Sequence, residues 1–304
     1  MDIQYDVIII GAGPAGMTGA IYASRAGLKT MMLEVSAPGG KLIKTHMIEN
    51  YPATAKEGGA ELAYRMFEHS TNFGAEYVYG DVKKVVEHDG YKEVVTADNS
   101  YLTKSVIIAS GTKERLLGLE GEDRLVGKGI SYCAVCDGAL YRGKDVVIIG
   151  GGNSALEESL FLTQFVNKVY IVIRRDVFRA DKIIQDKVLQ NDKIEIITKH
   201  VPHKIIASDR VEGIELENVD TKELTTLKID AIFPYIGAIP NTDFVKDLNI
   251  TNEQGYILVD NNMETAIKGI FAAGDCIDKT LRQVVTACSD GAIAGQKAYH
   301  YVNG

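Results

Sequence analysis

Two cysteines separated by two residues are the feature of this 304-residue sequence best suited to chemistry. They occur in the run Cys133-Ala-Val-Cys136-Asp137-Gly138. Two intervening residues allow a helix-start geometry in which the sulfurs can meet, form a small-ring disulfide and reopen. A thiolate at a helix N-terminus has a lowered pKa and becomes the attacking or leaving group. The spacing therefore predicts a redox-active disulfide.

Asp137 follows the pair directly and is a candidate general acid or base. It could protonate a leaving thiolate if burial raises its pKa. The alternative is a helix N-cap, a position at which Asp is common and affects stability alone. Both interpretations stay open at this point.

Two other interpretations of the cysteines compete with redox chemistry. A zinc site would need Cys276 and Cys288 to complete four thiolates, but these two do not form a second Cys-x-x-Cys pair and lie in apolar settings. Buried hydrophobic cysteines are the other alternative, and this one suits Cys276 and Cys288 themselves. Four cysteines are too few for a secreted disulfide scaffold. We therefore expect a redox pair and no metal site.

An internal repeat indicates the elements that must hold the cysteines in place. A β-branched, strand-like run ends twice in a glycine turn that leads into a helix rich in small residues. The first glycine of such a turn allows a tight bend, the second lets backbone N–H groups approach a pyrophosphate, and the third position lets the helix pack on the sheet. The positive end of the helix dipole then faces the phosphates. A glycine turn without a ligand is the alternative, and two copies in register weaken it. The copies are Gly11, Gly13, Pro14, Ala15 and Gly16, and Gly150, Gly152, Asn153, Ser154 and Ala155.

The residue that ends the second strand differs between the two copies. Glu34 ends the first, at the place where an acid bonds the ribose hydroxyls of adenosine. Its counterpart is Ile173, followed by Arg174, Arg175 and, four residues later, Arg179. Loss of the acid and gain of cations suit a 2′-phosphate. The sequence therefore predicts FAD at the first loop and NADPH at the second, with a solvated basic helix start as the alternative for the arginines.

The remaining pattern predicts an α/β fold with two Rossmann-like nucleotide-binding domains, one inserted into the other. Strand-like runs that end in glycine turns near residues 106–115 and 232–241 mark the two crossings between the domains. We expect a discontinuous FAD-binding domain at residues 1–113 and 242–304. We expect the NADPH-binding domain at residues 114–241, carrying the cysteine pair.

Composition and charge disfavour several classes of protein. Hydrophobic residues make up 46% of the chain and charged residues 24%, as in ordinary globular proteins. A net charge of −8 and a pI near 5.4 disfavour nucleic acid or an anionic membrane as the partner. No apolar stretch approaches the ~18 residues of a membrane span, and no basic targeting segment is visible at the N-terminus. We expect a cytoplasmic protein.

Together these motifs resemble the low-molecular-weight thioredoxin reductases along essentially the whole chain. The most specific of them is Cys-x-x-Cys-Asp-Gly, which lies shortly before the second glycine-rich nucleotide-binding loop. The larger disulfide reductases carry their cysteines early in much longer chains and fit poorly. The runs that carry the resemblance are Gly11–Gly16, Gly39-Gly40-Lys41-Leu42, Glu49-Asn50-Tyr51-Pro52, Cys133–Gly138, Gly150–Ala155, Arg174–Arg179, Gly274-Asp275 and Arg282-Gln283-Val284.

The resemblance implies a mechanism and further ligand residues. NADPH would deliver hydride to FAD, and the reduced flavin would break the Cys133–Cys136 disulfide. By similarity Cys136 faces the flavin, Cys133 attacks the disulfide of thioredoxin, and Asp137 supplies a proton. A homodimer is implied, as is rotation of one nucleotide domain against the other about hinges near 111–116 and 237–242. Further FAD contacts are implied at Gly40, Lys41, Leu42, Asn50, Gly274, Asp275, Arg282, Gln283 and Val284.

Two positions depart from the pattern that the family commonly shows. Ile173 stands in place of His before the arginine pair, which bears on the strength of the NADPH preference. Lys41 stands in place of Gln after the paired glycines, which puts a cation near the flavin.

Several other functions are compatible with parts of the pattern. The intact second glycine loop, Gly150–Ala155, disfavours two of them: a flavin reductase that takes electrons from ferredoxin, and a flavin-dependent dithiol oxidase. The flavoprotein of a peroxiredoxin system usually carries an extra N-terminal dithiol domain, which this sequence does not contain. The alternative that is not an enzyme is a nucleotide-binding module stabilised by a structural zinc ion.

Overall fold

The computed structural model describes residues 3–45, 47–54 and 56–304 of the chain. Met1 and Asp2, at the N-terminal end where no basic targeting segment is expected, lie outside these ranges. No helix within the described ranges is both long enough and apolar enough to cross a membrane.

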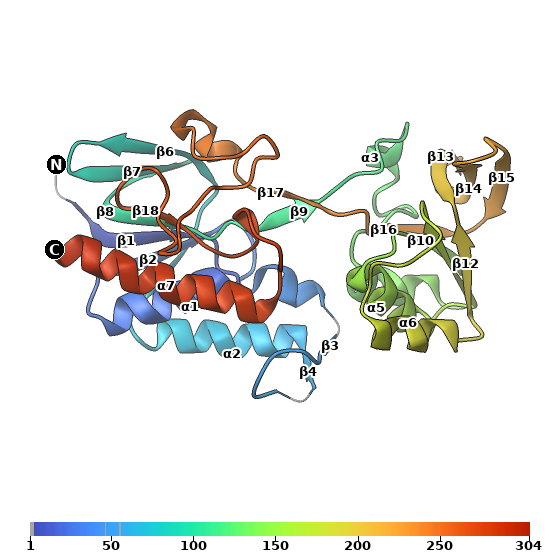
Figure 1. Ribbon diagram of the computed structural model, residues 1–304, viewed down its shortest axis with the longest axis horizontal. Coiled ribbons are helices and arrows are strands. Elements are labelled where there is room, and N and C mark those ends of the chain that lie inside the picture. The colour runs from blue at the N-terminus through green and yellow to red at the C-terminus, as the bar shows by residue number, and fades with distance from the viewer. Residues whose placement is uncertain (1–2, 46, 55) are drawn as a thin grey trace. The chain divides into compact units, whose positions relative to one another are not determined.

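The chain forms two units joined by two crossings (Figure 1). Unit 1 comprises residues 1–113 and 239–304, and unit 2 comprises residues 114–238. The crossings therefore lie at 113/114 and 238/239, whereas the sequence placed them at 113/114 and 241/242. They run through β9 (Thr112–Glu114) and β17 (Ala238–Pro240), which pair with each other.

Among the described residues, unit 1 is built on a seven-stranded sheet with parallel strands at its centre. Val7 to Ile10 are all buried, because this central strand is covered on both faces, and that burial accounts for its β-branched residues. Across the sheet the strands are β5 (Glu76–Tyr79), β2 (Thr30–Glu34), β1 (Tyr5–Ile10), β8 (Ser100–Ile108), β7 (Tyr91–Thr96) and β6 (Val82–His88), and β18 (Ile270–Ala272) pairs with the second half of β8.

Three helices lie on one side of this sheet in Figure 1: α1 (Pro14–Arg25), α2 (Gly59–Thr71) and α7 (Val284–Asn303). α1 and α7 pack against each other through small residues. A Cβ at Gly291 would lie 2.1 Å from the carbonyl oxygen of Ala15, and one at Gly295 would lie 2.6 Å from that of Gly19. Close approach of the two backbones therefore depends on glycine. The shorter elements of unit 1 are η1 (Gly40–Lys44), β3 (Met47–Ile48), β4 (Glu57–Gly58), η3 (Asp243–Leu248) and η4 (Gly274–Cys276).

Unit 2 combines a parallel sheet with a separate antiparallel one. The parallel strands are, in order, β12 (Ile194–Thr198), β11 (Lys168–Ile173), β10 (Asp145–Ile149) and β16 (Ala231–Pro234). The antiparallel strands are β13 (His200–Ala207), β14 (Val211–Asn218) and β15 (Leu224–Lys228). Its helices and 3-10 turn are α3 (Glu122–Leu125), α4 (Ala134–Asp137), η2 (Gly138–Tyr141), α5 (Asn153–Leu162) and α6 (Lys182–Leu189).

The two units repeat the same strand–helix–strand start. β1 pairs in parallel with β2, and β10 pairs in parallel with β11, each with a helix between them. The N–H of Gly11 donates to the Leu33 carbonyl at 2.7 Å, and the N–H of Gly150 donates to the Val172 carbonyl at 3.0 Å. Each glycine turn is thus held against the neighbouring strand. The predicted α/β fold with two Rossmann-like units is confirmed.

Candidate functional site

The cysteine pair forms a disulfide at the start of a short helix in unit 2. Cys133 is bonded to Cys136 and is the N-cap residue of α4. The N–H of Cys136 donates to Cys133 Sγ at 3.1 Å, and the N–H of Asp137 donates to the Cys133 carbonyl oxygen at 3.1 Å. Because an N–H donor stabilises negative charge on its acceptor, the turn favours a thiolate at Cys133.

Asp137 lies beside the disulfide, half-buried, at the last position of α4. It also occupies the N-cap position of η2, yet its side chain makes no capping hydrogen bond there. Burial raises the pKa of the Tyr141 phenol, and the nearby Asp137 carboxylate adds to this rise. The helix-cap interpretation of Asp137 therefore lacks the bond that it requires.

Two contacts hold the redox turn on the rest of unit 2. The N–H of Ala134 donates to the hydroxyl of Tyr235 at 3.1 Å, and Ala134 is fully buried. A Cβ at Gly138 would lie 2.8 Å from Cδ2 of Leu162, so glycine lets the turn pack against the end of α5. Since α5 begins at the second glycine loop, one helix supports both the loop and the turn.

The first glycine loop has the shape of a phosphate-binding cradle. Gly11 has φ +106°, and a Cβ there would lie 2.3 Å from the Ala109 carbonyl oxygen. A Cβ at Gly16 would lie 1.9 Å from the Gly11 carbonyl oxygen. At Gly13 the nearest atom would be Cα of Gly40 at 4.0 Å, so the loop is open on this side. α1 begins here with Pro14 and Ala15, without a side-chain cap or an acidic residue in its first turn, which leaves N–H groups available to a pyrophosphate.

Glu34 and the paired glycines hold this loop in place. The N–H of Ala12 donates to Glu34 Oε2 at 2.9 Å, and the N–H of Gly39 donates to the Ala12 carbonyl oxygen at 2.7 Å. The other carboxylate oxygen of Glu34 accepts from the N–H groups of Val35 and Ser36. Glu34 thus stands beside the loop and orders its backbone, a role that the sequence did not reveal.

Lys41 and Leu42 follow the paired glycines in η1. Leu42 is buried, whereas the Lys41 ammonium extends to Thr112 and donates to its Oγ1 at 2.6 Å. Thr112 lies just past the carboxyl end of β8, next to that of β1. Dinucleotides bind at the carboxyl ends of parallel strands in folds of this class. The positive charge of Lys41 is therefore held at that edge of the sheet.

The C-terminal candidates are brought together around the start of α7. Gln283 is the N-cap of this helix and forms a capping box with Thr286, so Val284 begins the helix. The Asn50 side-chain amide donates to Gln283 Oε1 at 3.2 Å. The guanidinium of Arg282 donates to the Asp275 carbonyl oxygen at 3.2 Å through Nε. These contacts join segments that lie far apart in the sequence.

The turn at Gly274 depends on an acid that sequence reasoning missed. Oδ2 of Asp290, a buried residue of α7, accepts from the Gly274 N–H at 3.0 Å and also bonds the ammonium of Lys279. Charge-assisted bonds of this kind are among the stronger ones in proteins. Asp290 therefore fixes the Gly274-Asp275 turn relative to α7. The available signal was an acid among the small and apolar residues of the first half of α7.

The second glycine loop repeats the cradle in unit 2. Gly150 has φ +141°, and a Cβ there would lie 2.2 Å from the Tyr235 carbonyl oxygen. Gly152 has no heavy atom within 4 Å of its Cβ position and precedes α5, which has no side-chain cap. Ser154 lies exposed in the first turn, and Ala155 is buried at the position of the third glycine. This loop, too, is open to a phosphate.

The arginine segment is fastened to this second loop. The N–H of Arg179 donates to the Gly151 carbonyl oxygen at 2.8 Å. Asn153 and Asp181 bond reciprocally: the Asn153 amide donates to Asp181 Oδ2 at 2.9 Å, and the Asp181 N–H donates to Asn153 Oδ1 at 2.7 Å. Ile173 is buried in the core of unit 2.

The guanidinium groups themselves face solvent. Arg174, Arg175 and Arg179 are exposed, and none of them forms an ion pair with another residue that the structure describes. The segment therefore presents three exposed guanidinium groups, with the exposed Asp176 among them, beside the open glycine loop. Such a surface suits an anionic ligand.

Comparison with known proteins agrees with this arrangement. The family model described as pyridine nucleotide-disulphide oxidoreductase matches residues 5–291. The chain is 48% identical to the thioredoxin reductase of Bacillus subtilis over 98% of this chain and 95% of that one. The crystal structure of Lactococcus lactis thioredoxin reductase superposes with a TM-score of 0.97 at 45% identity, covering 99% of both chains. A ferredoxin-flavin thioredoxin reductase from Clostridium acetobutylicum gives a TM-score of 0.53 at 32% identity, covering 97% of both chains.

The chain belongs to the low-molecular-weight thioredoxin reductases, within the pyridine nucleotide-disulphide oxidoreductase family. It is therefore an oxidoreductase, and family membership implies a flavin and a pyridine nucleotide. The two open glycine cradles fit such ligands, because each offers unpaired helix N–H groups and no acidic residue in the first helical turn.

The two remaining cysteines, Cys276 and Cys288, belong to unit 1, whereas the redox pair belongs to unit 2. Cys276 is fully buried, and burial raises the pKa of its thiol to about 11. Cys288 on α7 lies 3.8 Å from the hydroxyl of Tyr51. Within the described ranges, no group of three or more His, Cys, Asp or Glu residues is placed to hold a metal ion.

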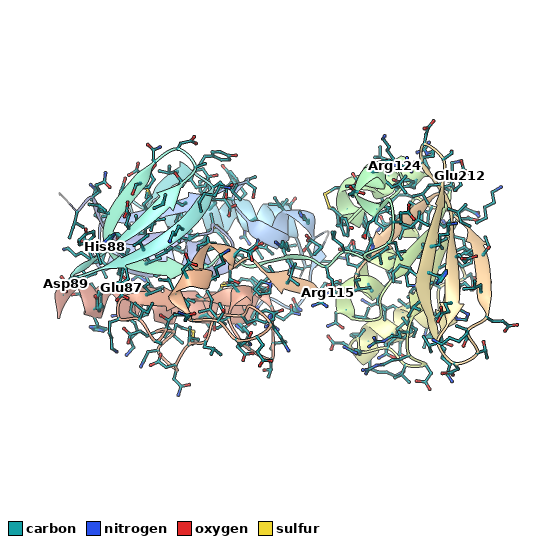
Figure 2. The ribbon with its side chains drawn as sticks, turned by 90° about the horizontal axis from the view of Figure 1, so that it is seen from above. Glu87, His88, Asp89, Arg115, Arg124 and Glu212 are labelled. Atoms are coloured by element: carbon teal, nitrogen blue, oxygen red, sulfur yellow. A yellow bond between two sulfur atoms is a disulfide. The ribbon has the colours of Figure 1, made fainter. Side chains whose placement is uncertain are left out.

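A polar pocket of about 300 Å³ lies at the β6–β7 turn of unit 1, where Glu87, His88 and Asp89 are labelled in Figure 2. Lys268, which also lines it, precedes β18, whereas Gly274 follows the carboxyl end of that strand. The pocket is therefore at the opposite end of β18 from the glycine turns and is separate from the nucleotide sites.

Two residues of unit 2 also escaped sequence reasoning. Glu158 on α5 is 8% exposed, and its Oε2 atom has no hydrogen-bond partner among the residues that the structure describes. Its signal was an acid on the apolar side of a helix. Tyr235, which contacts both the redox turn and the glycine loop, follows β16 and had no recognisable signal.

Proposed function

We propose that this protein is an NADPH-dependent thioredoxin reductase that contains FAD and reduces the disulfide of thioredoxin through Cys133 and Cys136. The observation that carries the proposal is the placement of the disulfide. It closes a turn whose supporting helix, α5, starts at an open nucleotide-binding loop. The 48% identity to a thioredoxin reductase over nearly the whole chain supports thioredoxin as the partner.

The residues proposed to hold FAD surround the first loop of unit 1. The N–H groups at the start of α1 suit the pyrophosphate, and Glu34 suits the adenosine ribose. The Asn50–Gln283 bond and the Asp275–Arg282 bond order polar groups near the start of α7, where the flavin end of the dinucleotide is proposed to bind.

The residues proposed to hold NADPH surround the second loop. The N–H groups at the start of α5 suit its pyrophosphate, and Arg174, Arg175 and Arg179 suit its 2′-phosphate. When bound, FAD and NADPH supply hydride and electron-pair transfer, which no amino-acid side chain provides.

The chain's own residues are proposed to carry the thiol chemistry. Two-electron reduction breaks the Cys133–Cys136 bond and, with uptake of one proton, leaves one thiol and one thiolate. The Cys136 N–H stabilises the Cys133 thiolate, which attacks one sulfur of the thioredoxin disulfide. Cys136 then attacks Cys133, re-forms the internal disulfide and releases reduced thioredoxin. Asp137, half-buried beside the pair, is proposed to deliver and recover the proton.

An anaerobic titration tests this function. Purified protein should be yellow, and NADPH should bleach the flavin absorbance in the absence of oxygen. Oxidised thioredoxin should then restore the colour and gain two thiols per molecule. Bleaching by reduced ferredoxin but not by NADPH would favour the ferredoxin-fed alternative, to which the Clostridium acetobutylicum relative is assigned by its name. A colourless protein that takes up no flavin would end the proposal.

The assembly and location are proposals of the same kind. The resemblance to the family supports a homodimer and a cytoplasmic protein. Sedimentation of the flavin-loaded protein at micromolar concentration would test the first, since a monomer would contradict it.

A further inference from the structure

Tyr235 links two functional parts of unit 2 that are far apart in the sequence. Its hydroxyl accepts the N–H of Ala134 at 3.1 Å, and this N–H belongs to the first residue of α4, between the two cysteines. The first N–H groups of a helix have no partner within the helix. Because Ala134 is fully buried, Tyr235 supplies the partner that solvent cannot supply.

The backbone of the same residue touches the second glycine loop. The Tyr235 N–H donates to the Ile149 carbonyl oxygen at 2.7 Å, which extends the β16–β10 pairing by one residue. The Tyr235 carbonyl oxygen occupies the space where a Cβ on Gly150 would lie, at 2.2 Å. The position of Tyr235 is therefore set by the loop, and its side chain transmits that position to the redox turn.

The hydroxyl is suited to a neutral hydrogen bond. Burial raises the pKa of Tyr235 above its ordinary range, and the nearby Glu158 carboxylate adds to the rise, while the Ala134 N–H opposes it. The phenol consequently stays protonated at neutral pH and acts on the turn as a neutral acceptor.

We propose that Tyr235 is a positioning residue for the redox pair: by accepting the Ala134 N–H, it holds the turn so that the Cys136 N–H remains directed at Cys133 Sγ. The inference rests on the proposed dithiol–disulfide function and adds a residue to it. It assigns no contact between Tyr235 and a reacting atom.

Loss of the hydroxyl acts unequally on the two redox states. In the disulfide state the sulfur–sulfur bond keeps the turn closed, so an Ala134 N–H without an acceptor stays buried. In the dithiol state the turn can open and let water reach this N–H. An unpaired buried donor disfavours its state by about tenfold or more. Tyr235→Phe should therefore shift the equilibrium toward the dithiol at a pH where both thiols are protonated, so that the weaker hold on the Cys133 thiolate does not oppose the shift.

The test equilibrates flavin-loaded protein with mixtures of reduced and oxidised glutathione under anaerobic conditions. Two glutathione thiols are oxidised to one disulfide, and the Cys133–Cys136 bond takes up their two electrons and two protons. Alkylation and peptide mass then count the free thiols. We expect Tyr235→Phe to move the equilibrium by about tenfold toward the dithiol. Tyr132→Phe is the matched control, because its hydroxyl bonds Glu122 at 2.5 Å instead of the turn, and it should leave the equilibrium unchanged.

A second measurement does not depend on any variant being active. In the unaltered oxidised protein, hydrogen exchange at the Ala134 amide should be slow. In reduced Tyr235→Phe, where the turn can open, it should be faster than in the reduced unaltered protein by about tenfold or more. An unchanged glutathione equilibrium with a lowered melting temperature would make Tyr235 merely structural and overturn the proposal. Rapid exchange at Ala134 in the unaltered protein would also overturn it. Because glutathione is the probe, failure to reduce thioredoxin would count against the proposed function and leave this inference to its own test.

Discussion

At the scale of single residues, the two cysteines of the redox turn have different surroundings. Cys136 is exposed, whereas Cys133 is half-buried and accepts an N–H. The hydrogen bond favours the thiolate on Cys133, which supports its proposed attack on thioredoxin and leaves Cys136 for the flavin. The roles that the family resemblance implied for the two cysteines stay predictions, and the next experiment separates them.

Serine replacement separates these roles. Either Cys133→Ser or Cys136→Ser should abolish thioredoxin reduction, because one sulfur cannot form the internal disulfide, while flavin bleaching by NADPH should persist. Thioredoxin-dependent NADPH oxidation and anaerobic absorbance measure the two steps. A long-wavelength thiolate–flavin band should appear in Cys133→Ser and be absent in Cys136→Ser. The reverse pattern would exchange the two roles, and substantial reductase activity in either variant would refute the mechanism.

Asp137 can be tested by a substitution that retains its shape. Asp137→Asn should slow disulfide reduction by roughly 10²–10⁴-fold, the usual contribution of a general acid. Its melting temperature should change little, since the Asp137 side chain makes no capping bond that Asn would disturb. Stopped-flow reoxidation of the reduced flavin and a thermal melt give the two quantities. Normal turnover together with lowered stability would return Asp137 to a structural role.

The loop between β11 and α6 is the element that should decide the choice of nucleotide. It is fastened at Arg179 through the glycine loop and at Asp181 through Asn153, so its guanidinium groups are presented by an ordered segment. Ile173 is buried and offers nothing to a ribose hydroxyl, so NADH gains no compensating contact.

We expect a preference for NADPH over NADH of roughly 10²-fold or more in kcat/KM, because each charge-assisted bond contributes about 1.5–3 kcal/mol. The double variant Arg174→Ala with Arg175→Ala should raise the KM for NADPH strongly and leave NADH turnover nearly unchanged. Steady-state kinetics at low and moderate salt check both statements, and the preference should weaken with salt. Arg142→Ala is the charge-matched control, since its guanidinium lies over the Phe165 ring elsewhere in unit 2. Equal kcat/KM values for the two nucleotides would mean that the arginines are only a solvated surface.

At the scale of the whole molecule, one buried carboxyl should make stability depend on pH. Burial raises the pKa of Glu158 from 4.5 to about 8, with a smaller contribution from Glu157. The folded protein therefore keeps a proton on Glu158 that the unfolded chain releases above about pH 4.5. More protons bound in the folded state mean that stability falls as the pH rises. The window of this loss runs from about pH 4.5 to about 8.

Glu158→Gln should remove this dependence, because the amide resembles the protonated acid and does not titrate. The melting temperature of the flavin-loaded protein should fall from pH 5 to pH 8, and this fall should be smaller in the variant than in the unaltered protein. Each kcal/mol of difference in the free energy of unfolding corresponds to ~2–4 °C. Asp192→Asn changes an exposed carboxyl of the same unit and should behave like the unaltered protein. A pH dependence that Glu158→Gln leaves intact would show that Glu158 is ionised in the fold.

The sequence by itself determined the features whose physics is local. A strand running into Gly11 or Gly150 must turn there, and two residues between Cys133 and Cys136 let one helical turn bring their sulfurs together. Glu34 and Ile173 could be assigned to equivalent places because each ends the strand after a glycine loop. From these alone followed the α/β class, the two nucleotide loops and the disulfide.

Only the tertiary structure decided which distant residues support these features. The Tyr235 hydroxyl bonds Ala134 across 101 positions, Lys41 reaches Thr112 across 71, and Asn50 reaches Gln283 across 233. Periodicity and turn chemistry carry no information about such pairs, because they depend on how strands and helices pack. For the same reason Asp290 and Glu158 could be recognised from the sequence as acids within helices, whereas their contacts could not. A buried polar group must find its partner in space, and that partner is chosen by the packing of the completed fold.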